Sequence, residues 1–148
     1  MTKPLLASEV GKKVEEGVPG SVVRAQGDTL WVHPERLLEV CRLLKETPGL
    51  ELTYLVAITG VDYIEYFEVV YHLVSIRHNH SLVLKVQVYG RDEPTVPSVV
   101  SVWQGADYQE REVYDLMGVR FAGHPNLKRI LTWEGFPGHP LRKDHLGA

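Results

Sequence analysis

The C-terminal segment of this chain constrains its architecture most, because it is apolar without having the period of a helix or a strand. It spans roughly thirty residues, a length at which structureless loops are uncommon in a compact domain unless they are functional or disordered. Disordered segments are poor in aromatic and aliphatic residues. This one contains seven large apolar side chains: Phe121, Leu127, Ile130, Leu131, Trp133, Phe136 and Leu141. We therefore expect the segment to lie against a surface, either its own domain's or a partner's.

Charged residues crowd the end of the helix expected just before this segment. Glu110, Arg111, Glu112 and Asp115 fall on neighbouring helical turns. Paired carboxylates can perform acid–base catalysis. However, Arg111 lies one turn from Asp115, a spacing that favours an ion pair. Because guanidinium groups suit buried carboxylates, we predict an interfacial salt-bridge network in which Arg111 and Arg129 are the forked donors.

The bulk properties indicate one ordinary globular domain. The chain has 148 residues, 44% of them hydrophobic and 24% charged, values typical of a soluble domain. No apolar run approaches the roughly 20 residues of a membrane span. The apolar stretch at the N-terminus ends at Glu9, Lys12 and Lys13, too early for a signal peptide. These features favour a cytoplasmic location.

Cysteine usage argues against a metal or redox centre. Cys41 is the single cysteine of the sequence, whereas iron–sulfur clusters and structural zinc sites draw on several thiolates. We predict that Cys41 is a core residue of an amphipathic helix. No glycine pattern for binding a nucleotide or a phosphate is present. The sequence therefore predicts no cofactor.

Histidines offer the one alternative metal site. A His-x-His pair with a third histidine can bind zinc. The interpretation we prefer is that the histidines lie in a polar turn and in an exposed tail. Those on or near the hairpin are His72, His78 and His80, and those in the tail are His124, His139 and His145.

Charge is distributed unevenly along the chain. The net charge is -3, but residues 119–148 carry five basic and two acidic side chains, or +3, which leaves -6 for the first 118 residues. A basic tail on an acidic body suits an anionic partner. Because the basic residues are diluted by Pro, Gly and apolar residues, we expect a protein surface rather than nucleic acid.

The pattern of elements predicts an α+β fold. We expect a mainly antiparallel sheet with helices packed on one face, followed by a long extended C-terminal tail. The division is into residues 1–117, the α+β domain, and residues 118–148, a tail that binds a partner. The expected helices are 8–16, 34–46 and 98–117. The last of them is capped by Ser98 and can be interrupted at Gly105. The expected strands are 21–25, 29–32, 50–59, 67–76 and 82–89.

The charged helix end and the tail together resemble a known family signature. The run Glu110-Arg111-Glu112-x-x-Asp115-Leu116-Met117-Gly118 is followed by His124-Pro125 and by Lys128-Arg129-Ile130-Leu131. This resembles the C-type subunits of NADH-quinone oxidoreductase, which form the 30 kDa-type subunit family of respiratory complex I. The stretch from Trp133 to Asp144 looks like its continuation, where the family typically reads Gly-x-Pro-Leu-Arg-Lys-Asp. One departure is His145, where relatives often have an aromatic residue.

The resemblance implies a non-catalytic subunit of the peripheral arm of a proton-translocating enzyme that passes electrons from NADH to quinone. Such a subunit holds no cofactor and is not expected to be catalytic alone. It binds the D-type subunit, which carries the quinone site, and neighbouring iron–sulfur subunits, and it binds no nucleic acid. It lies on the cytoplasmic face of the inner (cell) membrane and is associated with that membrane only through the complex. The implied partner-interface residues are Glu110, Arg111, Glu112, Asp115, Phe121, His124, Pro125, Lys128, Arg129, Trp133, Arg142, Lys143 and Asp144.

Two alternatives remain open. The same domain occurs in related membrane-bound hydrogenases and F420-linked dehydrogenases, so the equivalent subunit of one of these enzymes is the first alternative. The other alternative is a free-standing binding domain with a basic tail. Neighbouring genes for cysteine-rich and polytopic membrane subunits would distinguish an assembly subunit from such a domain.

Overall fold

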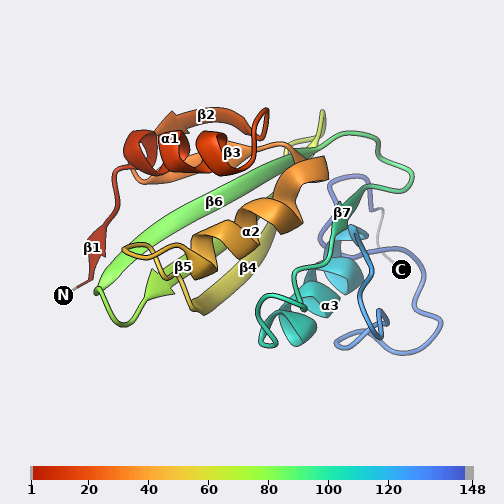
Figure 1. The fold of residues 1–148 in the computed structure, drawn as a ribbon. Helices are drawn as coiled ribbons and strands as arrows, with labels where there is room; N and C mark the ends of the chain where they lie inside the picture. Colours follow the sequence, from red (N-terminus) through yellow and green to blue (C-terminus); the bar gives the residue numbers. More distant parts are fainter. Residues whose placement is uncertain (1, 146–148) are drawn as a thin grey trace.

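A sheet covered by helices on one face forms the body of the protein (Figure 1). The computed structural model describes residues 2–145. The helices are α1 (Ala7–Gly17), α2 (Leu37–Glu46) and α3 (Ala106–Met117), and a short 3₁₀ turn, η1 (Pro34–Arg36), leads into α2. The strands are β1 (Lys3–Pro4), β2 (Val22–Gln26), β3 (Thr29–Val32), β4 (Tyr54–Asp62), β5 (Phe67–Ser75), β6 (His80–Val88), β7 (Thr95–Pro97) and β8 (Arg120–Ala122).

The main sheet has the strand order β2-β3-β6-β5-β4, and β1 adds to the free end of β6. The pairs β2–β3, β4–β5 and β5–β6 are antiparallel, whereas β3–β6 and β1–β6 are parallel. A second, two-stranded parallel sheet joins β7 to β8. The predicted α+β class, with a mainly antiparallel sheet, is confirmed; the parallel pairs make the sheet mixed.

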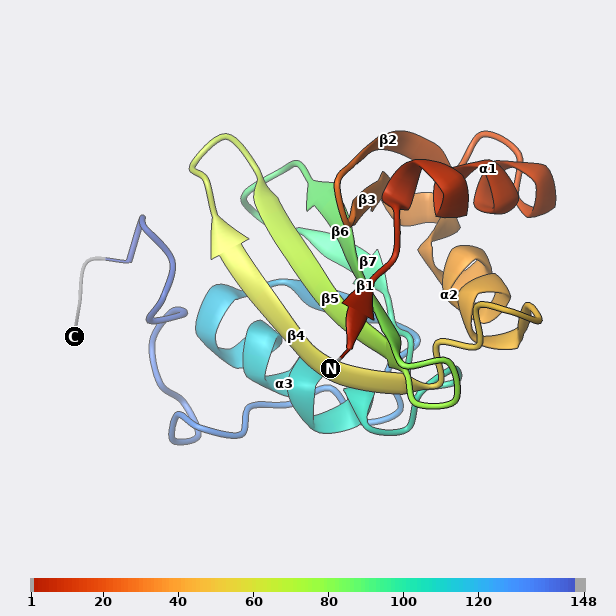
Figure 2. The same ribbon diagram turned by 90° about the vertical axis from the view of Figure 1, so that its left-hand side faces the viewer.

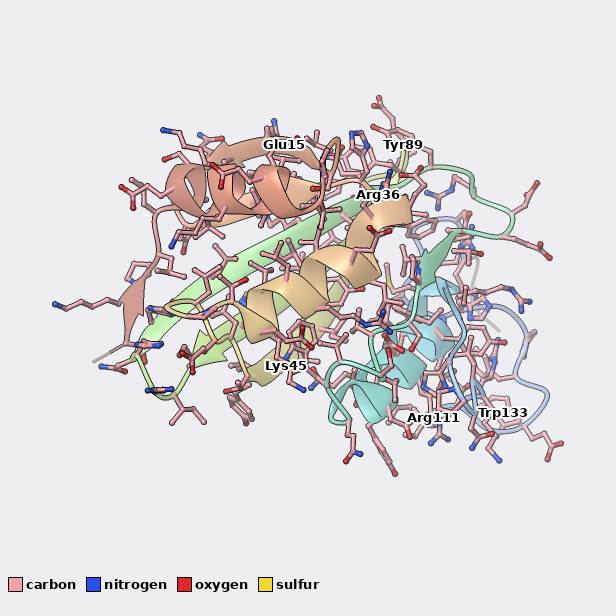
Figure 3. The ribbon with its side chains drawn as sticks, viewed as in Figure 1. Glu15, Arg36, Lys45, Tyr89, Arg111 and Trp133 are labelled. Atoms are coloured by element: carbon pink, nitrogen blue, oxygen red, sulfur yellow. The ribbon has the colours of Figure 1, made fainter. Side chains whose placement is uncertain are left out.

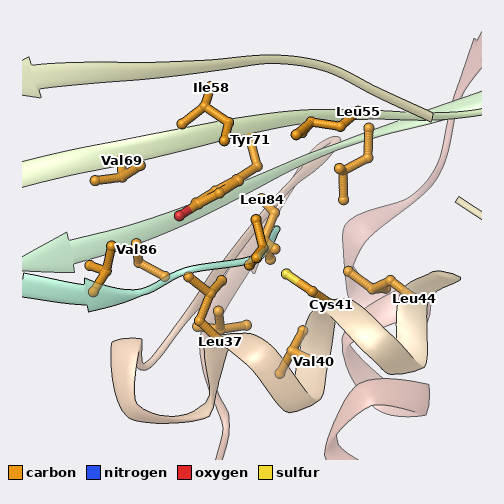
Figure 4. Packing of buried hydrophobic residues seen from close by; sticks show 14 of the residues in the cluster. Leu37, Val40, Cys41, Leu44, Leu55, Ile58, Val69, Tyr71, Leu84 and Val86 are labelled. Atoms are coloured by element: carbon orange, nitrogen blue, oxygen red, sulfur yellow. The ribbon is translucent and has the colours of Figure 1, made fainter. Parts of the chain in front are cut away.

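The core lies between the sheet and the helices. Along β5 and β6 alternate residues point inward, so that Tyr71 and Leu84 are fully buried. Figure 4 shows Leu37, Cys41 and Leu44 of α2 facing these strands. Cys41 is buried there, as predicted, and burial raises the pKa of its thiol.

Helix α3 packs against the edge strand β4 on the same face. A Cβ at Gly60 would lie 3.0 Å from Val113 and 3.2 Å from Met117, so the missing side chain lets the helix approach the strand. Gly118 ends α3 in the left-handed conformation, with φ of 77°. This contact places the charged end of α3 beside the C-terminal segment.

Several predicted boundaries differ from the structure. The strand expected at 50–59 begins at Tyr54, because Leu50 and Leu52 instead close the end of α2 through backbone bonds to Thr47 and Leu44. The prediction that Ser98 caps the last helix is wrong. Helix α3 begins at Ala106, and the Ser98 hydroxyl binds Glu110.

The C-terminal segment starts inside the packed body. Strand β8 pairs with β7 and buries Phe121, and beyond it residues 123–145 form turns and bends without a helix or strand. Figure 2 shows this segment running past α3 toward the tip of the β4–β5 hairpin. The division at residue 118 into a body and an extended, partner-binding tail stays a prediction.

Candidate partner-binding surface

Asp115 holds the middle of the tail. Its side chain is fully buried, and its carboxylate accepts hydrogen bonds from the backbone N–H groups of Ile130 (3.1 Å), Leu131 (2.7 Å) and Thr132 (2.9 Å), and from the Thr132 hydroxyl. Burial alone would raise the pKa of Asp115, but these donors lower it to about 2. The ionised carboxylate thus acts as a fixed acceptor for the tail backbone.

Arg111 does not pair with Asp115, so that part of the predicted network is wrong. Its guanidinium instead donates to the backbone carbonyls of Lys128 (3.1 Å) and Arg129 (3.4 Å). The physical reason is competition: four donors from the tail already occupy the Asp115 carboxylate. Arg111 and Asp115 therefore hold the same tail segment through opposite groups, one by donating and the other by accepting.

Arg129 is the cation nearest Asp115, at 3.9 Å from Oδ1. The Arg129 guanidinium also donates to the Thr132 hydroxyl and to the carbonyl of Gly138. His139 lies on the other side, with Nδ1 2.8 Å from the backbone carbonyl of Asp115, and burial lowers the pKa of its imidazole. These contacts fold the tail into a closed loop against the end of α3.

A second carboxylate, Asp62 at the end of β4, holds the last described part of the tail. Asp62 accepts two bonds from Arg91 (2.8 and 2.7 Å) and one from the backbone N–H of Lys143 (2.9 Å). These hydrogen bonds keep the pKa of Asp62 well below its usual range. Arg91 also binds Asp144, which Arg142 binds in turn. Arg142 and Asp144 are thus joined to the body by two residues that the sequence did not single out.

Glu110 and His124 lie inside the domain. The Glu110 carboxylate accepts bonds from the Ser98 hydroxyl (2.6 Å) and the Val99 N–H (2.8 Å). Burial raises its pKa to about 7 despite these two donors. The buried His124 ring lies 3.1 Å from Asp107 and 4.0 Å from Glu110. The structure shows only internal contacts for these side chains, as for Phe121.

The remaining predicted interface residues are solvent-exposed. Trp133, labelled in Figure 3, has 64% of its surface exposed and packs edge-on against Phe136. Leu131 and Leu141 are each 60% exposed. Glu112, Pro125, Lys128, Lys143 and Asp144 are exposed as well. The tail is thus fixed largely through its backbone, whereas three of its large apolar side chains, those of Leu131, Trp133 and Leu141, point outward.

The sequence analysis assigned no site role to four residues: Asp62, Arg91 and Thr132, which hold the tail, and Ser98, which binds Glu110. Only Ser98 carried a local signal, and that signal suggested a helix cap. Asp62 and Arg91 are separated by 29 positions, and Arg91 and Asp144 by 53, so nothing in the local pattern links them.

The structure brings together no metal-binding cluster in residues 2–145: no group of three or more His, Cys, Asp or Glu side chains is placed to hold an ion. His78 and His80 stack on each other, but His78 binds Glu51 and His80 binds the carbonyl of Leu50.

A small cleft of about 190 Å³ lies between β4 and α3 and is bordered by Leu141. Among the described residues, no helix is both long and apolar enough to cross a membrane.

Comparison with known proteins gives matches over nearly the whole chain. A sequence-family model described as respiratory-chain NADH dehydrogenase, 30 Kd subunit, matches residues 30–148. A relative from Coxiella burnetii, named as the C subunit of NADH-quinone oxidoreductase, is 37% identical over 96% of this chain and 77% of its own length. One of the same name from Roseiflexus castenholzii is 48% identical over 83% of this chain and 73% of its own.

A solved structure also matches. It is a chain from the membrane-bound sulfane sulfur reductase, an archaeal respiratory membrane complex, with a TM-score of 0.70 and 28% identity. The match covers 93% of this chain and 84% of that one.

Proposed function

This chain belongs to the family of the 30 kDa subunit of respiratory-chain NADH dehydrogenase, and we propose that within such a complex it is a non-catalytic assembly subunit whose C-terminal tail binds its partners. In this role the chain joins the quinone-site subunit and neighbouring iron–sulfur subunits of the peripheral arm while electrons pass from NADH to quinone. It reaches the cytoplasmic face of the membrane only as part of the complex.

One observation carries the proposal: the tail is anchored by its backbone and presents the large apolar side chains of Leu131, Trp133 and Leu141 to solvent. Asp115 alone accepts three consecutive backbone N–H groups, while Leu131 and Trp133 on the same stretch remain exposed. A preorganised backbone reduces the entropy lost on binding. Exposed tryptophan is also the residue type most enriched at interface hot spots. This arrangement suits a docking segment better than a surface loop.

The charge of the tail indicates the chemistry of the partner. Residues 119–148 carry a net charge of +3, and Lys128 and Lys143 are exposed. We therefore expect the partner to offer an apolar pocket for Trp133 with acidic side chains around it. The match to the sulfane sulfur reductase complex supports an assembly role, because that complex has a different named chemistry. It also keeps a related membrane-bound oxidoreductase open as the alternative assembly.

The test is Trp133→Ala in cells that make the whole complex. The abundance of the complex on a native gel should fall several-fold, whereas donor-to-quinone activity normalised to that abundance should stay unchanged. Ile76→Ala is the matched control, because Ile76 is equally exposed but lies in the β5–β6 turn, away from the tail. Normal abundance with lost activity would contradict the proposal and assign the tail a part in the reaction itself.

A further inference from the structure

Ile64, at the tip of the β4–β5 hairpin, has a backbone conformation that its side chain disfavours. Its φ is 72°, in the left-handed region. A β-branched residue is a genuine outlier there, because its side chain crowds the backbone. The other non-glycine residues of positive φ in residues 2–145 are Asn79, a type that tolerates this region, and Glu51. Ile64 is therefore the most strained of the three.

Hydrogen bonds from neighbouring polar groups hold Ile64 in this conformation. Asp62 Oδ1 accepts the N–H of Ile64 at 2.8 Å, and Arg91 donates to the carbonyl of Ile64 at 2.8 Å. Asp62 and Arg91 are themselves joined by two hydrogen bonds. The ion pair thus fixes both the N–H and the carbonyl of Ile64.

No packing offsets the strain, since 61% of the surface of Ile64 is exposed. Asn or Gly at this position would adopt the same backbone without crowding and without exposing an apolar side chain. Strained residues cluster at ligand-binding and switch sites, where contacts with the surrounding structure hold the backbone in its disfavoured conformation. An exposed and strained isoleucine is accordingly better explained by contact with another molecule than by folding.

Three tyrosines form a cluster next to the tip. The ring of Tyr66 lies 5.2 Å from that of Tyr63 and 5.4 Å from that of Tyr89. Tyr63 and Tyr89 are largely exposed. Tyrosine joins a large apolar ring to a hydroxyl that can pair with another molecule. An exposed tyrosine cluster beside an exposed isoleucine of the same hairpin has the composition of an interface hot spot.

The tip is continuous with the end of the tail. Asp62, which binds the N–H of Ile64, also binds the N–H of Lys143, and Arg91 links Ile64 to Asp144. Figure 2 shows the C-terminal segment rising toward the hairpin tip. A partner that covers the last part of the tail therefore meets Ile64 as well.

We propose that Tyr63, Ile64, Tyr66 and Tyr89 form a second docking surface, which inserts Ile64 into an apolar pocket of the same polypeptide that binds the tail. This inference rests on the proposed function, because it takes the tail-binding polypeptide as the occupant. It adds the site on the body of the chain that completes the interface.

The test uses Ile64→Asn, which removes the apolar side chain and also relieves the strain. The full-length variant carries a tag and is co-expressed with untagged wild-type chain, so that the two compete for incorporation into the complex. We expect incorporation of Ile64→Asn into the complex to fall at least several-fold. The thermal unfolding midpoint of the isolated variant should rise by about 3 °C, because the backbone strain is relieved. Ile76→Asn, at an exposed isoleucine without positive φ, should change neither quantity.

The combination of higher stability and poorer incorporation supports the docking surface, because a variant that merely misfolds would lose both. Equal incorporation of Ile64→Asn and wild type would overturn it. If Trp133→Ala still competes poorly in that case, the proposed function of the tail stands without the second surface. If neither variant competes poorly, both proposals fail. Binding of the purified wild-type chain to phosphatidylglycerol vesicles, lost in Ile64→Asn, would assign the tip to a lipid surface and overturn the polypeptide partner.

Discussion

Thr132 binds Asp115 twice, through its backbone N–H at 2.9 Å and through its side-chain hydroxyl. With Ile130 and Leu131 it saturates one buried carboxylate that belongs to the end of α3. Hydrogen bonds to a charged group contribute about 1.5 to 3 kcal/mol each, more than neutral ones. Asp115 is therefore the residue on which the position of the tail depends most.

Asp115→Asn should loosen this part of the tail without unfolding the body. An amide lacks the charge and turns an N–H donor toward the backbone donors, which should cost about 2 kcal/mol. Amide hydrogen exchange at Ile130, Leu131 and Thr132 should then accelerate by about 30-fold. Glu112→Gln, at an exposed carboxylate on the same helix, is the control. In cells, Asp115→Asn should lower the amount of assembled complex more than the turnover of what assembles.

The attachment at Asp115 should also respond to acid. The pKa of Asp115 is lowered from 3.8 to about 2 in the folded protein. A lowered carboxyl pKa contributes stability that is present above about pH 4 and is lost as pH falls through about 2. Exchange protection of the Thr132 amide should accordingly persist at about pH 4.5 and decline below it, and protection unchanged at about pH 2 would contradict this role.

Glu110 should have the opposite pH dependence. Burial raises its pKa from 4.5 to about 7, so the folded state holds its proton more tightly than the unfolded state. This contribution to stability is complete below about pH 4.5 and is lost as pH rises through about 7. The nearby Asp107 carboxylate also raises the pKa of Glu110, and the His124 ring lies 4.0 Å from the Glu110 carboxylate. The free energy of unfolding should fall by on the order of 2 kcal/mol between about pH 5 and 8.

Glu110→Gln removes the titrating group, and its single amide oxygen can still accept the Val99 N–H. Its NH2 group takes the place of the oxygen that accepts the Ser98 hydroxyl, so Ser98 must turn to become the acceptor. We expect the slope of stability against pH between about 5 and 8 to flatten in this variant, measured by urea unfolding at several pH values. Glu112→Gln should leave the slope as in wild type. An unchanged slope in Glu110→Gln would show that Glu110 is not the source of the pH dependence.

The sequence predicted the helices and strands whose residues repeat with a local period. It missed the contacts between residues that are distant along the chain. The helix carrying Cys41 and the strands around Tyr71 follow from alternation and helical spacing. The parallel pairing of β3 with β6 has no local signal, because register between distant strands is set by the core. The same limit explains the wrong Arg111–Asp115 ion pair: helical spacing makes it possible, but the backbone donors of the tail occupy the carboxylate.

Gly118→Ala should destabilise the protein through the tail as well as through the backbone. Gly118 has φ of 77°, and a Cβ there would lie 2.8 Å from the ring of His139. That ring cannot move freely, because its Nδ1 is bound to the carbonyl of Asp115 at 2.8 Å. We expect a loss of about 2 to 3 kcal/mol in the free energy of unfolding, from backbone strain plus the displaced ring.

Gly135→Ala separates the two contributions. Gly135 has φ of 83°, but a Cβ there would meet no atom within 4 Å, so only backbone strain of about 1 kcal/mol applies. Urea unfolding of both variants gives the difference, which measures the contact between the tail and the end of α3. Equal losses in the two variants would mean that in solution His139 does not lie against Gly118, and that the tail leaves α3 when its partner is absent.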